Sequence, residues 1–156
     1  MLELFAKHSL LDLNLRAKGD LEVDHHHTVE DVGLALGDAL NQALGERKGI
    51  ERYGFSLLPM DETLSRVALD LGGRPYLVLQ MANKKKKILD FELSLLGEFL
   101  RAFVTQARMN LHIHQLYGAD AHHAWESVFK GLARALKMAC RHDPRVKGVP
   151  SSKGIL

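Results

Sequence analysis

The 156-residue sequence has little of three things that would place it in a specialised class of protein. It holds one cysteine, Cys140, which excludes an intrachain disulfide and a thiolate metal cluster and indicates a reducing compartment. Its net charge is only +2, from 21 basic and 19 acidic side chains, so the net charge indicates neither nucleic acid nor a membrane as a partner. It has no run of about 18 apolar residues, and the start "MLELFAKHSLLDL" lacks the pattern of a signal peptide. We therefore expect a cytoplasmic protein with no membrane segment.

The length and apolar content are those of one domain with a single core. Apolar positions that recur every three or four residues predict helices over residues 1–7, 28–44, 89–107 and 121–141. Apolar positions that alternate predict strands over residues 10–19, 53–59, 63–73, 74–81 and 108–118. We expect the middle three strands to form a β-meander and the lysine run 84–87 to be a solvated loop. The mixture predicts an α+β fold with helices packed against sheets.

Histidine is the residue type in excess, because five of the nine histidines lie in two short stretches, "DHHHTVED" and "AHHAWESVFK". A shift of 96 residues superimposes the two stretches, pairing His26 with His122, His27 with His123 and Glu30 with Glu126. The apolar positions that follow also match, and a shift of 98 aligns the segments upstream. These matches predict a pseudo-duplicated domain with repeats of about 1–82 and 83–156, each running helix, strand, then His-His-x-x-Glu helix.

The spacing within each motif suits metal binding. Residues four apart share a face of a helix, so His26 and Glu30 can reach one ion together. The adjacent His27 points about 100° around the axis and is aimed at a different ion. Both motifs together would supply four imidazoles and two carboxylates to two ions, within one subunit or across an interface. This ligand set suits Mn, Fe, Ni, Co or Zn, and the spacing does not choose among them.

A single His-His-x-x-Glu motif has a simpler interpretation. Histidines at one helix start are more often solvated or part of the helix cap, and Asp24 or Thr28 can be simply a cap of that helix. The second copy at an equivalent position is what favours metal binding. The repeat selects His26 and His27 and leaves the neighbouring His25 as a spectator.

Five segments of the sequence form a recognisable set: "DHHHTVEDVGLALGDAL", "KGIERYG", "PMDETLSRVALDLGGRPY", "LHIHQLYGADAHHAWESVFKGLARAL" and "DPRVKGVPSSKGIL". They resemble the imidazoleglycerol-phosphate dehydratase family of histidine biosynthesis, and the likeness covers essentially the whole chain. The resemblance implies a duplicated α+β unit with helices sandwiched between two sheets. It further implies a 24-subunit shell of identical chains whose active sites lie between subunits and hold two Mn²⁺ ions.

The resemblance implies the reaction as well, which removes water from imidazoleglycerol phosphate to give imidazoleacetol phosphate. Metal ions on the substrate imidazole would stabilise its anion and help to expel the hydroxyl through a diazafulvene-like intermediate. A carboxylate must move the proton, and Glu30 and Glu126 match the motif carboxylates. Glu126 is the better candidate for this acid–base work.

A site for the substrate phosphate is also implied, where charge-assisted hydrogen bonds suit a dianion. The residues that match it are His8, Arg52, Arg74, Lys130, Ser151 and Lys153. Asp61 in "PMDE" lies in a family motif too, but a structural role is at least as well supported.

The sequence departs from the family pattern at its start. Family members carry roughly forty further residues, about two or three strand and turn units, with a metal-binding histidine in a Phe-Asp-His-Met stretch. Met1 matches the methionine of that stretch, and by the repeat the position ahead of it corresponds to Glu98, an expected metal ligand. We therefore expect an N-terminally truncated chain with one incomplete metal site. The alternative to a metal-dependent lyase is a catalytically impaired metal-binding assembly protein, or a metal-storage module.

Overall fold

The computed structural model describes residues 1–20 and 22–154. Over these residues the elements follow in the order α1 (Leu2–Ser9), α2 (His26–Leu44), β1 (Tyr53–Met60), β2 (Thr63–Asp70), β3 (Tyr76–Gln80), β4 (Lys87–Ile88), β5 (Phe91–Glu92), α3 (Ser94–Ala107), β6 (Asn110–Tyr117) and α4 (Ala121–Ala139). The predicted α+β class is confirmed. No helix in this part of the chain is long and apolar enough to cross a membrane.

The main sheet has four strands in the order β1-β2-β6-β3. β1 and β2 pair antiparallel through a two-residue turn, and β6 pairs antiparallel with β2 and parallel with β3. The predicted β-meander is therefore wrong, because β6 lies between β2 and β3. A parallel pair needs a long crossover, and α3 supplies it between β3 and β6.

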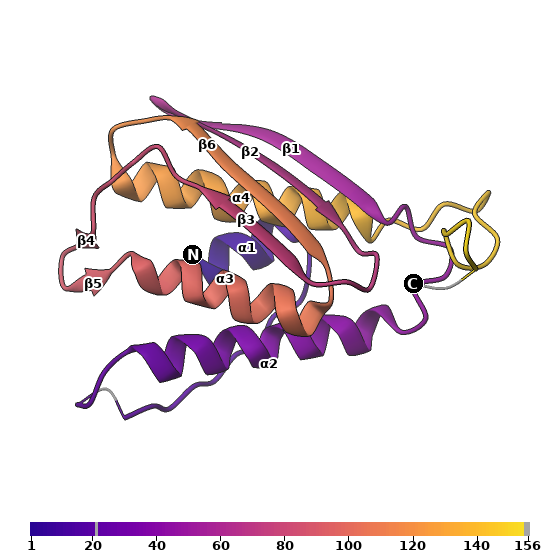
Figure 1. Ribbon diagram of the computed structural model, residues 1–156, viewed down its shortest axis with the longest axis horizontal. Helices are drawn as coiled ribbons and strands as arrows, with labels where there is room; N and C mark the ends of the chain where they lie inside the picture. Colours follow the sequence, from indigo (N-terminus) through magenta and orange to yellow (C-terminus); the bar gives the residue numbers. More distant parts are fainter. Residues whose placement is uncertain (21, 155–156) are drawn as a thin grey trace.

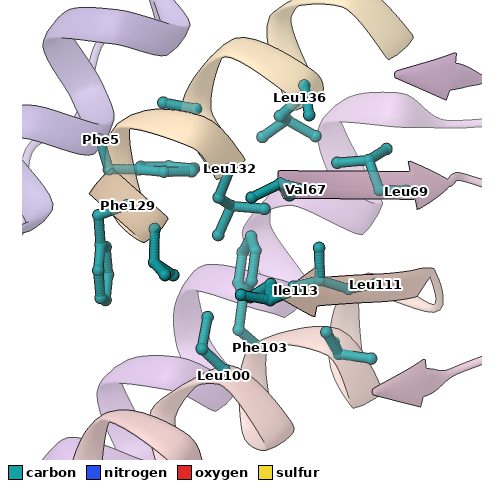
Figure 2. Packing of buried hydrophobic residues seen from close by; sticks show 14 of the residues in the cluster. Phe5, Val67, Leu69, Leu100, Phe103, Leu111, Ile113, Phe129, Leu132 and Leu136 are labelled. Atoms are coloured by element: carbon teal, nitrogen blue, oxygen red, sulfur yellow. The ribbon is translucent and has the colours of Figure 1, made fainter. Parts of the chain in front are cut away.

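Helices cover one face of this sheet (Figure 1). α4 packs under β1 and β2, α3 packs under β3, α1 lies against α4, and α2 covers the outer side of α3. Figure 2 shows the core between these layers, where Val67 and Ile113 of the sheet meet Phe103 of α3 and Leu132 of α4. On the opposite face of the sheet, β1 exposes large apolar side chains at alternate positions: Tyr53, Phe55 and Leu57.

Two glycines let α2 approach α3 closely. A Cβ atom on Gly33 would lie 2.7 Å from the carbonyl oxygen of Phe99, and one on Gly37 would lie 2.5 Å from that of Phe103. Both distances are far below ordinary van der Waals contact, so only glycine allows this helix spacing. The close contact fixes the position of α2, whose first turn carries the first histidine motif.

The strand predicted over residues 10–19 is wrong, because this segment runs along α2 without joining a ladder. Its apolar residues Leu11 and Leu15 stay 40% and 42% exposed. Alternation makes a strand only where a second strand offers hydrogen bonds, and none of the described residues does so here. The equivalent segment of the second half, β6, lies between β2 and β3 and forms a strand, as predicted.

Three smaller expectations also need correction. The helix predicted over residues 89–107 begins at Ser94, because the preceding residues form the short β4–β5 ladder. The lysine run before it is exposed, as predicted, although Lys87 belongs to β4 and pairs with Glu92 at 3.0 Å. Within the described residues this two-stranded ladder is the only second sheet, so the implied pair of sheets around the helices is not found. Helices α2 and α4, which carry the two histidine motifs, are both 19 residues long.

Candidate active site

The first histidine motif lies at the start of α2. The Asp24 carboxylate accepts hydrogen bonds from the backbone N–H of His26 at 2.8 Å and of His27 at 3.4 Å, so Asp24 and not Thr28 is the side chain that caps this helix. The Nε2 atom of His26 lies 3.6 Å from a carboxylate oxygen of Glu30. The predicted sharing of one helix face by these two side chains is therefore confirmed. His27 is 77% exposed, and its Nδ1 lies 3.3 Å from Oδ1 of Asp24.

The second motif, at the start of α4, repeats this geometry. The Asp120 carboxylate accepts from the backbone N–H of His122 at 2.7 Å and of His123 at 3.0 Å. The Nε2 atom of His122 lies 3.2 Å from a carboxylate oxygen of Glu126. Asp120 follows Asp24 by the same 96 residues, so the repeat includes the capping aspartate, which the sequence comparison did not use.

His123 has a partner that sequence reasoning missed. Its Nδ1–H donates to Oε2 of Glu62 at 2.8 Å, while the other carboxylate oxygen of Glu62 accepts from the backbone N–H of Asp120 at 2.9 Å. The hydrogen bond from His123, together with that from the Asp120 N–H, lowers the pKa of Glu62 to about 2, and the bond to Glu62 raises the pKa of His123. Glu62 thus directs Nε2 of His123 outward, with Asp61 at 3.7 Å from it.

The two motif carboxylates differ in their surroundings. Glu126 is 13% exposed and forms a 2.5 Å ion pair with Lys130, whose hydrogen bond lowers the pKa of Glu126. Glu30 is 45% exposed, and its one ion-pair partner within the described residues is His26. Glu126 is therefore held as an ionised carboxylate in a more enclosed position.

A cationic cavity of about 470 Å³ lies at the other end of the sheet. It gathers four of the predicted phosphate-binding residues, which are Arg52, Arg74, Ser151 and Lys153. Gly72 and Gly73 form part of its wall, and so does Arg108, which the sequence analysis did not select. The other two predicted residues lie elsewhere: Lys130 contacts Glu126, and His8 is on α1.

Arg52 organises this cavity. Its guanidinium donates to the Asp70 carboxylate at 2.6 and 2.9 Å and to the carbonyl oxygen of Pro150 at 2.8 Å. The hydrogen bond to Asp70 raises the pKa of Arg52, so the side chain stays charged. The contact with Pro150 holds the C-terminal "PSSKG" segment against the sheet and brings Ser151 and Lys153 to the cavity.

The predicted metal ligands are imidazoles and carboxylates, which suit a divalent ion. One subunit, however, brings only some of them close together. Each motif offers one imidazole–carboxylate pair, and nowhere in residues 1–20 and 22–154 do three or more histidine, cysteine or acidic side chains cluster as an ion would require. Glu98, on α3, pairs with Arg101 at 3.5 Å and contacts neither motif. The remaining ligands of any ion would have to come from outside these pairs.

The fold and this site define an α+β protein with two equivalent imidazole–carboxylate helix starts and a separate cationic cavity. A family model described as "Imidazoleglycerol-phosphate dehydratase" matches residues 1–136. Relatives of that name from Acetivibrio thermocellus and Bacillus licheniformis are 56% and 53% identical, each over the whole chain and 80% of the relative.

Solved structures agree with the sequence matches. The imidazoleglycerol-phosphate dehydratase of Staphylococcus aureus matches with a TM-score of 0.85 at 42% identity, over 91% of this chain and 81% of that one. The Pyrococcus furiosus protein, solved with (S)-C348, matches with a TM-score of 0.87 at 39% identity, over 99% and 83% of the two chains. The chain therefore belongs to the imidazoleglycerol-phosphate dehydratase family of hydro-lyases, which act in histidine biosynthesis.

Proposed function

We propose that this chain catalyses the metal-dependent dehydration of imidazoleglycerol phosphate to imidazoleacetol phosphate, with Mn²⁺ as its metal. One observation carries the metal dependence. Two equivalent helix starts each present an imidazole and a carboxylate on one face, with nitrogen–oxygen distances of 3.6 and 3.2 Å. Capping interactions alone would not require this pairing in both places, because the two aspartates already cap the helices.

The ligands would be the two motifs together with one carboxylate of α3: His26, His27, Glu30, Glu98, His122, His123 and Glu126. Imidazole with carboxylate suits Mn²⁺ and other divalent ions of its series. When bound, such an ion supplies Lewis-acid polarisation of the substrate imidazole. Glu62 would hold His123 in the tautomer that such an ion needs, since it takes up the Nδ1–H and leaves the lone pair on Nε2.

Glu126 is the residue we assign to proton transfer, with Glu30 as the second candidate. A base must be ionised before it reacts, and the ion pair with Lys130 lowers the pKa of Glu126 in the required direction. Its low exposure strengthens its interactions relative to those of Glu30. Lys130 also lies close enough to this centre to contact a substrate phosphate that reaches it.

The phosphate is assigned mainly to the cationic cavity, where Arg74, Ser151 and Lys153 lie beside the Arg52–Asp70 pair. Lys130 and His8 lie outside that cavity, and the metal motifs lie at helix starts away from it.

A site built from all of these groups needs more than one subunit. We therefore propose a homo-oligomer, of 24 subunits by family resemblance, and the exposed apolar side chains of β1 support a contact between copies. We also place the enzyme in the cytoplasm, in keeping with its single cysteine.

The proposal is tested by metal removal and restoration. The purified chain is treated with a chelator, dialysed, and assayed for imidazoleacetol phosphate with and without added Mn²⁺. We expect turnover to disappear with the metal and to return with Mn²⁺, and light scattering to report a particle far larger than 17.4 kDa. Turnover that is indifferent to chelation would refute the metal dependence. A chain that binds Mn²⁺ without any turnover would match the catalytically impaired assembly protein instead.

The choice between the two carboxylates needs a second comparison. Glu126→Gln removes the proposed base and keeps the shape of the side chain, and Glu30→Gln is the matched change in the other motif. We expect the larger loss of kcat in Glu126→Gln, measured at saturating Mn²⁺ so that weaker metal binding does not contribute. A larger loss in Glu30→Gln would exchange the two roles.

A further inference from the structure

Arg108 lines the cationic cavity together with Arg52, Arg74 and Lys153, although it lies in none of the recognised motifs. It is the C-cap residue of α3, two residues before the start of β6. The residue is exposed, so its guanidinium has access to solvent and to any anion in the cavity.

The backbone at Arg108 is in an unfavourable conformation for an arginine. Its φ and ψ are 51° and 54°, the left-handed region, where helix C-caps favour glycine. A side chain at this position carries a strain that glycine would avoid. The local helix ending therefore does not explain the arginine, and a role for its side chain must be sought elsewhere.

A buried arginine holds this strained turn in place. Arg47, only 5% exposed, donates to the carbonyl oxygens of Arg108 at 3.0 Å, Ala107 at 2.8 Å and Leu71 at 2.7 Å. Leu71 directly precedes the glycine pair of the cavity wall. Arg47 thus links the turn that carries Arg108 to the residue before Gly72, and this link uses only the backbone carbonyl oxygen of Arg108.

The cationic side chains of the cavity differ in whether other groups of the protein already bind them. The guanidinium of Arg52 is engaged by Asp70 and by the carbonyl oxygen of Pro150, so much of its charge is already neutralised. The side chain of Arg108, in contrast, makes no hydrogen bond or ion pair with any of the described residues. Its charge lies close enough to Arg47 to help burial lower the Arg47 pKa. Among the described residues, Arg108 is therefore a cation without a side-chain partner at the edge of the cationic cavity.

We propose that Arg108 is a further phosphate-binding residue of this chain, supplying a guanidinium for an oxygen of the substrate phosphate. The proposal rests on the assignment of the cavity to phosphate in the proposed function. It explains why an arginine occupies a turn that favours glycine: strain in the backbone places a free positive charge where a dianion binds.

The test measures inorganic phosphate binding by titration calorimetry and thermal unfolding on the same variants. Arg108→Ala should weaken phosphate binding about tenfold, as expected for loss of one charge-assisted contact. Arg108→Gly should weaken it equally and at the same time raise Tm by a few degrees, because glycine relieves the strained turn. A purely structural arginine would not give this combination of higher stability and lower affinity. Arg101→Ala, on the same helix, is the matched control for loss of a positive charge and should bind phosphate within about twofold of wild type.

Arg74→Ala and Lys153→Ala separate failure of this inference from failure of the cavity assignment. If these two variants weaken phosphate binding but both Arg108 variants bind as wild type, the role of Arg108 is refuted and the cavity stands. If Arg74→Ala and Lys153→Ala also bind as wild type, the cavity is not the phosphate site and the proposal for Arg108 falls with it.

Discussion

The Nδ1–H of His123 donates to Oε2 of Glu62 across 2.8 Å, joining the turn between β1 and β2 to the first turn of α4. Because Glu62 fixes which ring nitrogen of His123 carries the proton, Glu62→Gln should weaken Mn²⁺ binding by about 10- to 100-fold, the usual range for loss of such a partner. Titration of Mn²⁺ into the chelator-treated protein measures this. Glu46→Gln, which removes an exposed carboxylate paired with Lys48, is the control and should bind Mn²⁺ as wild type.

The same pair predicts a pH dependence of stability in the metal-free protein. The raised pKa of His123 gives stabilisation that is complete below its ordinary value of 6.5 and is lost as pH rises through the folded value. The lowered pKa of Glu62 gives stabilisation that is present above 4.5 and is lost as pH falls to about 2. The Tm difference between wild type and Glu62→Gln should therefore be largest between the ordinary pKa values of the two groups, which are 4.5 and 6.5. This places the largest difference near pH 5.5 (about the midpoint). A difference that is constant from pH 3 to 9 (roughly the range of a stable buffer series) would show that the pair does not act through charge.

The paired motifs predict the metal content of histidine variants. His27→Ala and His123→Ala each remove one expected ligand nitrogen, so each should reduce bound Mn²⁺. His25→Ala is the matched control within the same histidine run, and it should leave the metal content unchanged because the repeat gives His25 no counterpart. Elemental analysis of the purified variants decides the point. Full metal content in both motif variants would be incompatible with a two-metal site.

Removal of single cations from the cavity should weaken phosphate recognition. Arg74→Ala and Lys153→Ala each delete a charge-assisted contact, with an expected loss of about 1.5 to 3 kcal/mol in phosphate binding. Asn110 donates to the carbonyl oxygen of Arg74 at 2.6 Å, so the backbone at Arg74 should stay in place when its side chain is removed. Calorimetric titration with inorganic phosphate measures the loss, and Mn²⁺ content measured on the same samples should not change.

What the sequence predicted well was local in the chain. The spacing of His26 and Glu30 determines a shared helix face whatever the surroundings, and the structure confirms it in both motifs. The apolar period of α4 likewise predicted a helix that buries one side against the sheet. Both results follow from backbone geometry over a few residues, which tertiary contacts do not alter.

What the sequence did not predict depends on contacts between distant segments. Residues 10–19 have strand-like alternation but no strand beside them, and β3 pairs with β6 instead of β2. Glu62 reaches His123 across 61 positions, and only the folded hairpin brings the two together. Arg108 carries no motif, and its place in the cavity follows from how α3 ends beside β3 and β6. A pattern along the chain holds no information on such neighbours.

The close contact of α2 and α3 gives the last prediction, from two helix-interior glycines with opposite surroundings. A Cβ on Gly37 would meet the Phe103 carbonyl oxygen at 2.5 Å, whereas a Cβ on Gly97 would meet only Leu79 Cδ2 at 3.6 Å. Gly97→Ala should therefore stabilise the protein by about 0.5 to 1 kcal/mol, through lower entropy of the unfolded chain and better helix propensity. Gly37→Ala gains the same propensity but must push two helices apart, so it should destabilise by about 1 to 3 kcal/mol.

Urea unfolding of both variants, monitored by circular dichroism, compares the two changes under one condition. Because α2 carries His26 and Glu30 at its start, a shift of this helix in Gly37→Ala should also lower Mn²⁺ affinity, while Gly97→Ala should keep it. Equal stability changes in the two variants would mean that α2 does not approach α3 as closely as described. In that case the position of the first histidine motif would not depend on this glycine contact.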